Sequence, residues 1–270
     1  MRILAFIIVI ICSITLVLGN LHWKEKLENS SAVGAAVNEK ASTKEEGSDI
    51  GVTTGSEIDP SLKEKLAFLP FGTSSFIEEA ASNQQTIDLL ILGSEANTMG
   101  SMPWTKLFQE KMEDAYGDLF HITIKEIRDT SSYTVVNEEL HSENLEVTPD
   151  LLILEPFLIK DNSVGISIEQ SIEHIEMIIE DFKSLNPELH VFLQPAHPLH
   201  GGLYYPRDVE VFREYVELSE YTYINHWQVW PEDHNSAELE ALLMEDNAGP
   251  NDEGHEVWAE YVANIFINEE

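Results

Sequence analysis

Side chains that can do chemistry follow the short apolar runs of this sequence. Ser94 and Glu95 come directly after the run Ile87–Gly93, which places a hydroxyl and a carboxylate in one turn. Hydroxyl, carboxylate and imidazole groups are the usual side chains of nucleophilic and acid–base catalysis. Similar polar stretches follow four later apolar runs, at 127–132, 155–162, 194–202 and 225–233.

Four histidines lie in or directly after the last two of these stretches, so we consider a metal site. They are His197, His200, His226 and His234. Their spacing matches no established zinc-ligand pattern, so we expect no metal. No Walker loop is present and no Gly-x-Gly-x-x-Gly follows the first apolar run, so we expect no nucleotide cofactor either.

Several neighbouring residues could border a ligand pocket, and a simpler interpretation exists for each. Glu95 could be a base, a ligand contact or an acid at a helix start, where backbone N–H groups favour negative charge. His197 and Tyr204 could line the pocket. Tyr204, Trp227 and Trp230 could stack on sugar rings, or they could pack in the core.

The elements that must position these residues alternate in type from residue 86 onward. The predicted strands are 87–92, 120–124, 151–154, 191–193 and 221–224, and the predicted helices are 103–116, 133–140, 167–185, 209–218 and 253–267. Strands that alternate with helices predict a parallel sheet covered on both faces, an α/β three-layer sandwich with five strands. Ligands in such folds bind beyond the carboxyl ends of the strands, where the polar stretches lie.

Composition excludes several classes of function. The 270 residues contain 15 Lys and Arg against 49 Asp and Glu, a formal charge of −34. A nucleic-acid binder needs a basic face, and so does a protein that adsorbs to an anionic membrane. Cys12 is the only cysteine, so neither an intrachain disulfide nor a cysteine-based zinc site can form.

The N-terminal segment indicates export. Arg2 precedes the run Ile3–Leu18, which contains no charged residue. Residues 1–23 therefore predict either a cleaved signal peptide, with a site after Gly19, or an uncleaved membrane anchor. Either alternative places the remaining chain outside the cytoplasm, anchored to the membrane or secreted, and the membrane is contacted only through this segment.

The rest of the chain divides into three parts by composition. Residues 24–60 contain no aromatic residue and carry eight acidic residues and four lysines, so we expect a disordered linker. Residues 61–84 predict a helical lead-in interrupted at Pro70, and residues 85–270 form the main domain. The sequence does not predict an oligomeric state.

The main domain resembles the SGNH hydrolase family, also called GDSL-type esterases, in four blocks with the family's order and spacing. The blocks are the strand and turn 87–96, the loop 128–132, the strand and loop 149–162, and the segment 246–255 before the last helix. The resemblance implies a flavodoxin-like sheet and hydrolysis of acyl esters, including O-acyl groups on glycans. It implies a serine nucleophile, a histidine base oriented by an aspartate, and an oxyanion site.

The catalytic blocks depart from the family pattern. Direct alignment places Ser94 on the family's aspartate and Glu95 on its nucleophilic serine. Arg128 falls on the oxyanion glycine, and Gly249 falls on the catalytic histidine.

Two hypotheses follow from these departures. In the first, the machinery is displaced: Ser94 is the nucleophile, Asp252 and His255 supply the Asp-x-x-His pair, and Asn162 is the oxyanion donor. In the second, hydrolysis has been lost and the domain binds a cell-wall or exopolysaccharide ligand. A purely structural envelope protein is a third, weaker alternative.

Overall fold

A five-stranded parallel sheet forms the centre of the domain. The computed structural model describes residues 60–245 and 248–268, so the predictions for the N-terminal segment and for residues 24–59 lie outside the described residues. The strand order is β2-β1-β3-β4-β5. The strands are β1 (Ile87–Gly93), β2 (Phe120–Glu126), β3 (Leu151–Leu154), β4 (His190–Leu193) and β5 (Thr222–Tyr223).

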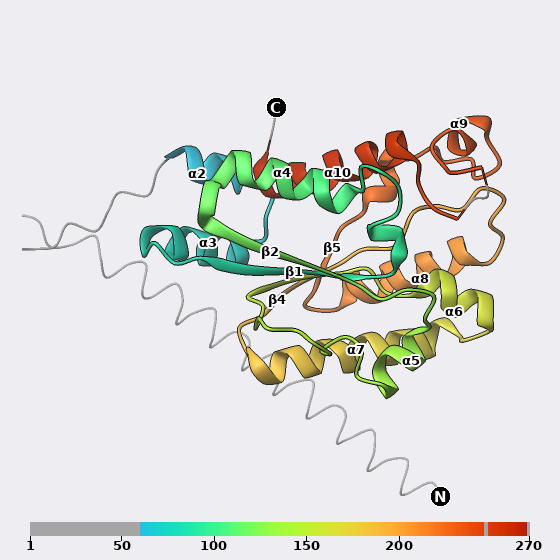
Figure 1. The fold of residues 1–270 in the computed structure, drawn as a ribbon, viewed down its shortest axis with the longest axis horizontal. Helices are drawn as coiled ribbons and strands as arrows, with labels where there is room; N and C mark the ends of the chain where they lie inside the picture. Colours follow the sequence, from blue (N-terminus) through green and yellow to red (C-terminus); the bar gives the residue numbers. More distant parts are fainter. Residues whose placement is uncertain (1–59, 246–247, 269–270) are drawn as a thin grey trace, which may run out of the picture. The chain divides into compact units, whose positions relative to one another are not determined.

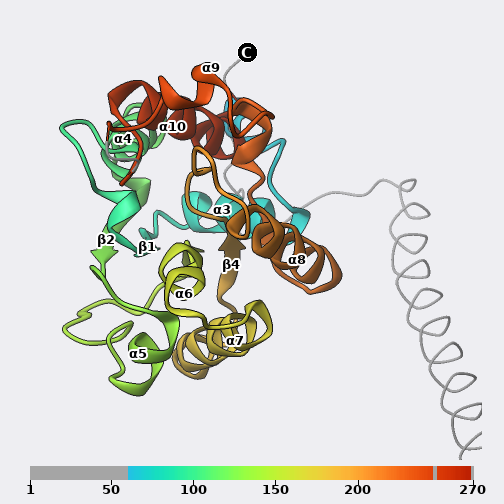
Figure 2. The same ribbon diagram turned by 90° about the vertical axis from the view of Figure 1, so that its right-hand side faces the viewer.

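Helices cover both faces of this sheet, which makes a three-layer α/β/α sandwich. Figure 1 shows α4 (Trp104–Tyr116) and α10 (Asp252–Ile267) on one side and α5 (Ser132–Asn137) and α7 (Ile168–Leu185) on the other. Seen along the sheet, the same two layers stay apart (Figure 2). The other helices are α2 (Pro60–Lys65), α3 (Phe71–Ser82), α6 (Leu158–Val164), α8 (Tyr205–Leu218) and α9 (Ala237–Glu240).

The side chains of β1 show how the sequence produces two hydrophobic cores. Successive residues of a strand point to opposite faces of the sheet. Leu89 and Ile91 join the core that contains Trp104 of α4, whereas Leu90 and Leu92 join the core under α7. The strands are therefore apolar on both faces, as a buried parallel sheet requires.

The carboxyl edge of the sheet brings two polar residues side by side. Leu92 pairs with Leu154, and Leu154 pairs with Leu193. The ladder continues for one residue, because the Glu155 N–H donates to Leu92 O at 2.9 Å and the Gln194 N–H to Leu154 O at 3.1 Å. Since the three leucines face α7, Glu155 and Gln194 face α4 and α10.

The long helix α7 starts at a capping box. The Ser167 side chain accepts from the Gln170 N–H, and the Gln170 side chain accepts from the Ser167 N–H. This pairing satisfies two of the free donors at the helix start. Within the described residues, no helix combines the length and the apolar character needed to cross a membrane.

Element boundaries differ from prediction in several places, among them α5, α6 and α8. The stretch 155–162, predicted as a loop, contains helix α6 from Leu158 onward. Helix α5 ends at Asn137 rather than at Leu140, because Glu139 adopts a left-handed φ of 53°. Helix α8 begins at Tyr205, four residues before the first predicted position, with Pro206 in its first turn, where a missing N–H costs nothing.

Candidate functional site

Ser94 lies at the turn that ends β1. It caps the 3₁₀ turn Glu95–Asn97, because its Oγ accepts from the Ala96 N–H at 3.3 Å. Its hydroxyl donates to Oε2 of Glu155 at 2.7 Å, and its N–H donates to the same oxygen at 2.7 Å. The predicted nucleophile is thus in hydrogen-bond contact with a carboxylate from the neighbouring strand.

Glu155 is 1% exposed, which is unusual for a carboxyl group. Its Oε2 accepts a third bond from Asn97 Nδ2 at 3.0 Å, while its Oε1 has no partner among the described residues. Burial raises the pKa of Glu155 to about 8, although the bonds from Ser94 and Asn97 act in the opposite direction. Such a group changes its charge near neutral pH.

Gly93 makes room for this arrangement. A Cβ at this position would lie 2.3 Å from Asn97 Nδ2 and 2.7 Å from Glu155 Oε2. Both contacts are shorter than real Cβ atoms show, so only glycine lets the carboxylate reach the Ser94 turn.

His255 lies in the first turn of α10, fully buried. Its Nδ1 accepts from the Trp104 N–H at 3.2 Å, so the neutral ring carries its proton on Nε2. Burial lowers the pKa of His255 to about 4, and both the charge of Asp252 and a backbone hydrogen bond with Met99 oppose this shift. Asp252 itself accepts from Ser101 Oγ at 2.7 Å, and this bond is the main reason that its pKa is lowered.

The predicted nucleophile and its predicted base are not hydrogen-bonded to each other. Within the described residues, the hydroxyl of Ser94 bonds to Glu155, and no bond joins His255 to Ser94 or to Asp252. A side chain at Gly100 would contact both Asp252 and His255, so these two lie near each other at the start of α10. The triad Ser94, Asp252 and His255 therefore stays a prediction.

Two further buried polar residues follow β4. Trp258 Nε1 donates to Gln194 Oε1 at 3.1 Å, and Gln194 Nε2 has no partner in the part of the chain that the structure describes. The same holds for both ring nitrogens of His197. Burial, with smaller contributions from the nearby His255 and His226, lowers the pKa of His197 to about 3.

The described side-chain contacts of the remaining predicted site residues do not include Ser94. Asn162 is on α6, and its Nδ2 donates to Asp208 of α8 at 2.6 Å. This hydrogen bond joins the two helices. Tyr204 is 66% exposed and stacks loosely under the Arg207 guanidinium. Glu95 contacts a different loop, which is described below.

The aromatic residues after β5 border a surface cleft. Trp227 and Trp230 line a cleft of about 290 Å³ together with Arg213 and His234. Trp230 is 4% exposed, and its indole N–H donates to His226 Nδ1, so it also belongs to the core. Within residues 60–245 and 248–268, no three His, Cys, Asp or Glu side chains are grouped so that they could hold a metal ion.

Comparison with known proteins identifies the architecture. The sequence matches no family model and no curated protein. The structure matches the crystal structure of a GDSL-like lipase from Parabacteroides merdae with a TM-score of 0.57 and 13% sequence identity, over 67% of this chain and 95% of that chain. It also matches the crystal structure of a carbohydrate esterase family 3 protein from Talaromyces cellulolyticus with a TM-score of 0.54 and 13% sequence identity, over 66% of this chain and 95% of that chain. A lipolytic protein of the G-D-S-L family from Desulfitobacterium hafniense matches with a TM-score of 0.55 and 16% sequence identity, over 67% of this chain and 99% of that chain.

The chain has the SGNH hydrolase fold. The predicted resemblance and the predicted three-layer architecture are both confirmed by these neighbours and by the sheet order. At these identities the likeness establishes the fold, and the chemistry has to be argued from the site.

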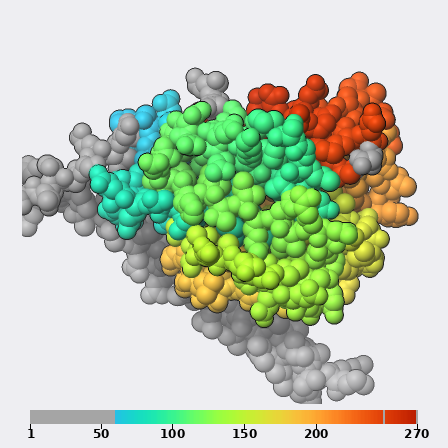
Figure 3. Space-filling view, viewed as in Figure 1, coloured from blue at the N-terminus to red at the C-terminus, as the bar shows by residue number. Residues whose placement is uncertain are grey.

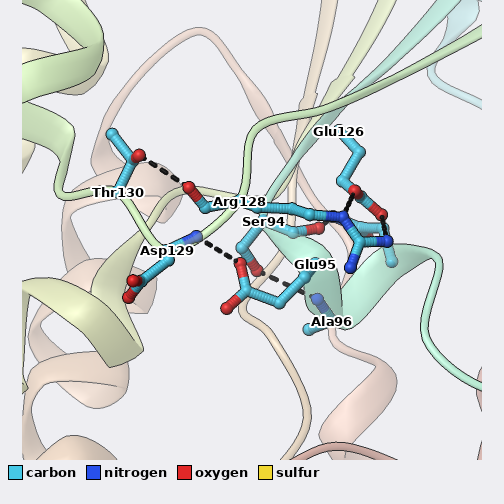
Figure 4. A network of polar contacts seen from close by, with 8 residues as sticks. Ser94, Glu95, Ala96, Glu126, Arg128, Asp129 and Thr130 are labelled. Carbon is cyan, nitrogen blue, oxygen red and sulfur yellow. Dashed lines mark hydrogen bonds and ion pairs between the residues drawn. The ribbon is translucent and has the colours of Figure 1, made fainter.

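Glu95, which the sequence alignment places at the SGNH nucleophile position, bonds to the second block. Its Oε2 accepts from the Asp129 N–H at 3.0 Å (Figure 4). Arg128, at the oxyanion-glycine position, turns away to form an ion pair with Glu126. The Asp129 N–H, next to the residue that aligns with the family's oxyanion glycine, is therefore bonded to the Glu95 carboxylate.

Gly249, which the sequence alignment places at the SGNH catalytic histidine, lies against Met99. A Cβ on Gly249 would lie 2.6 Å from Met99 Sδ, so a histidine could not enter without displacing that side chain. In the space-filling view, green atoms of the N-terminal half of the domain lie beside the red atoms of its C-terminal segment (Figure 3). Helix α4 packs against helix α10.

Sequence reasoning did not single out Glu155, Asn97 or Gln194. One signal was available for Glu155: it directly follows four fully buried apolar residues, and a carboxylate there has to be buried too. The contact of Asn97 with Glu155 depends on the turn after β1 and could not be read from spacing.

Proposed function

We propose that this protein is an ester hydrolase in which Ser94 is the nucleophile and Glu155 is its base. The observation that carries the proposal is the 2.7 Å hydrogen bond from Ser94 Oγ to Glu155 Oε2, at the strand edge where this fold binds ligands. The esterase and lipase names of the structural neighbours support the same reaction class.

The dyad can carry both halves of ester hydrolysis. Ser94 Oγ attacks the ester carbonyl while Glu155 accepts the hydroxyl proton. Glu155 then gives this proton to the departing alcohol, which leaves an acyl group on Ser94. A water molecule attacks the acyl carbon, Glu155 takes the water's proton and returns it to Ser94 Oγ, and a carboxylic acid is released.

The environment of Glu155 suits this role. A general base works best when its pKa lies near the working pH. An ordinary glutamate is too weak a base, but burial raises the pKa of Glu155 from 4.5 to about 8. A carboxyl group tuned by an apolar site in this way is an established pattern in enzymes.

The reaction takes place outside the cytoplasm in this proposal, on a small-molecule ester or an O-acyl group of a glycan. Arg2 and the uncharged run Ile3–Leu18 support export, and the polar residues 24–59 support a tether. Protease added to intact protoplasts should remove the domain. Complete protection of the domain would contradict this part of the proposal.

A second candidate function is ligand binding without hydrolysis. Two observations favour it: Glu95 replaces the family's serine, and Met99 fills the space of the family's histidine. In that case the strand edge would bind a cell-wall or exopolysaccharide ligand. The wild-type protein would then hydrolyse no ester.

Turnover of p-nitrophenyl acetate separates the two candidates. The hydrolase proposal predicts turnover that Ser94→Ala abolishes and that Ser184→Ala leaves unchanged, because Ser184 is exposed on α7 and its hydroxyl donates to Asp181 O of the same helix. Wild-type turnover that Ser94→Ala does not affect would refute Ser94 as the nucleophile.

A further inference from the structure

The cleft beyond the end of β5 is a second hollow at the carboxyl edge of the sheet. Its volume is about 290 Å³, and its walls come from α8 and from the segments that follow β4 and β5. Strand β5 lies three strands from β1, which corresponds to about 14 Å at about 4.8 Å per strand. The cleft and Ser94 therefore lie along one edge of the sheet, at a separation that a short chain molecule can span.

Aromatic rings and prolines form the apolar part of this cleft. They belong to Tyr223, Trp227, Trp230, Pro198 and Pro231. Trp230 is 4% exposed, and the indole N–H of Trp227 donates to a backbone oxygen of the loop after β4 at 2.7 Å. Because these contacts hold the rings in place, the apolar wall exists before a ligand binds, which lowers the entropic cost of binding.

Two polar side chains of the cleft have free hydrogen-bonding capacity. In the part of the chain that the structure describes, the amide of Asn225 and the carboxylate of Glu232 make no side-chain hydrogen bond or ion pair. Asn225 is half-buried and Glu232 is exposed. An amide offers donors and an acceptor, and a carboxylate offers acceptors. A ligand that carries several hydroxyl groups satisfies both side chains at once.

The charges of the cleft disfavour an anionic ligand. Arg213 is neutralised by ion pairs with Glu210 and Glu217, the second at 3.4 Å. Burial lowers the pKa of His234, so its ring is neutral at pH 7. Among the described residues, Glu232 is thus the one charge of the lining without an ion-pair partner, and the whole chain carries −34. A phosphate or carboxylate ligand would be repelled.

Size and chemistry together select a sugar unit. Small-ligand sites measure about 300–1,000 Å³, so this cleft is at the lower limit and has room for about one ring-sized group. A pyranose ring has an apolar face of C–H groups and an edge of hydroxyl groups, which match the aromatic wall and the polar side chains. A fatty acyl chain would leave those polar side chains without hydrogen bonds.

We propose that this cleft binds one sugar unit of a neutral oligosaccharide, with Asn225 and Glu232 bonded to its hydroxyl groups and the aromatic wall against its C–H face. The assignment of the substrate rests on the proposed function. The ester that Ser94 attacks is then an O-acyl group on the same glycan chain, at the other end of the stretch between β5 and β1.

Titration with neutral oligosaccharides tests the cleft without turnover. In calorimetry, full-length Ser94→Ala protein should bind at least one of chitotetraose, xylotetraose and cellotetraose saturably. Adding Asn225→Ala should weaken that binding about tenfold, because ligand hydroxyls lose a partner. Adding Asn137→Ala, which removes an amide that donates to its own helix α5, should leave binding unchanged. Binding of none of the three, or equal binding with Asn225→Ala, would overturn the inference.

The charge of the ligand gives a test that does not depend on the folding of the Asn225 variant. Tetragalacturonate, an anionic tetrasaccharide, should bind more weakly than the neutral oligosaccharides. Glu232→Gln, which changes an exposed side chain, should reduce this difference. Tighter binding of tetragalacturonate than of the neutral oligosaccharides would overturn the assignment of a neutral ligand.

Kinetics connect the cleft with Ser94. Asn225→Ala should lower kcat/KM, through KM, about tenfold more for the O-acetylated form of the best-bound oligosaccharide than for p-nitrophenyl acetate, which has no sugar to place in the cleft. Equal losses for both esters would overturn the assignment of the substrate. Saturable binding that depends on Asn225, in a protein that hydrolyses neither ester, would support the cleft and would refute the proposed function alone.

Discussion

The hydroxyl and the backbone N–H of Ser94 both bond to one oxygen of Glu155, at 2.7 Å each. These two bonds join the ends of two neighbouring strands and aim the serine hydroxyl at a buried carboxyl group. In the proposed mechanism the two residues act as a unit, and their separate losses should not add.

Glu155→Gln should therefore reduce kcat/KM by about 10²–10⁴, about as much as Ser94→Ala. Glutamine keeps an oxygen that can accept from Ser94 and Asn97, so the fold should be retained. Steady-state kinetics of the two single variants and the double variant check this. Glu173→Gln, which changes an exposed residue of α7, is the matched control. A double variant much slower than either single variant would contradict the claim that Ser94 and Glu155 act together.

The pH dependence of turnover distinguishes the two candidate bases. A base must be deprotonated, so kcat/KM should rise with pH and level off above the pKa of the base. The value for Glu155 is about 8 and the value for His255 is about 4. We predict an inflection near 8 that Glu155→Gln removes. A profile that is already flat from pH 5 to 9 would favour His255 as the base.

Gly93→Ala should damage both stability and turnover. The new Cβ would meet Asn97 Nδ2 at 2.3 Å and Glu155 Oε2 at 2.7 Å, and such overpacking costs about 1–3 kcal/mol. Gly72→Ala is the control, because its nearest neighbour would be His190 Cε1 at 3.9 Å. That change in helix α3 should stabilise by about 0.5–1 kcal/mol. Urea unfolding measures the free energy of unfolding of both variants. Equal values would contradict the claim that the turn at Gly93 has no room for a Cβ.

The free energy of unfolding should fall as pH rises toward 8, because of Glu155. The folded protein keeps the Glu155 proton up to about pH 8, whereas the unfolded chain loses it near 4.5. The folded state thus binds more protons in this window, and stability declines by at most about 1.4 kcal/mol per pH unit.

Histidine acts in the opposite direction at lower pH. Burial lowers the pKa of both His197 and His226 from 6.5 to about 3, so each stabilises the fold less as pH falls below 6.5. Denaturant titrations between pH 6.5 and 8 therefore isolate Glu155. The free energy of unfolding should decline with pH in the wild type and should not decline in Glu155→Gln. The same pH dependence in both proteins would contradict a raised pKa of Glu155.

Restoring the SGNH histidine should not restore SGNH catalysis. Gly249→His should lower the melting temperature, because its Cβ would lie 2.6 Å from Met99 Sδ. Combining it with Met99→Ala should recover part of the loss. Glu95→Ser, alone or with Gly249→His, should not increase ester turnover, and an increase would show that the family positions are still functional.

The order and type of the strands could be predicted because apolar runs and helical periodicity are local properties of the sequence. Strand β3 was predicted with its observed limits, since four apolar residues after Pro149-Asp150 leave little choice. Helix α6 could not be predicted, because its seven residues carry little periodicity and its start at Leu158 depends on packing against α7 and α8.

The site could be predicted only in part, for a related reason. Ser94 was found because a serine after the first strand is visible in the sequence. Its partner Glu155 lies 61 residues away, and only the register between β1 and β3 brings them together. The assignment of Asn162 to the site depended on a loop after β3, where the structure has a helix.

Labelling with a fluorophosphonate tests the central claim most directly, because a serine activated by a neighbouring base displaces fluoride and becomes covalently phosphonylated. Intact mass and peptide mapping at pH 8 should show one adduct per chain, on Ser94. The adduct should be absent in Ser94→Ala, much slower in Glu155→Gln and unchanged in Ser184→Ala. No adduct on the wild-type protein, or an adduct on another residue, would contradict the account.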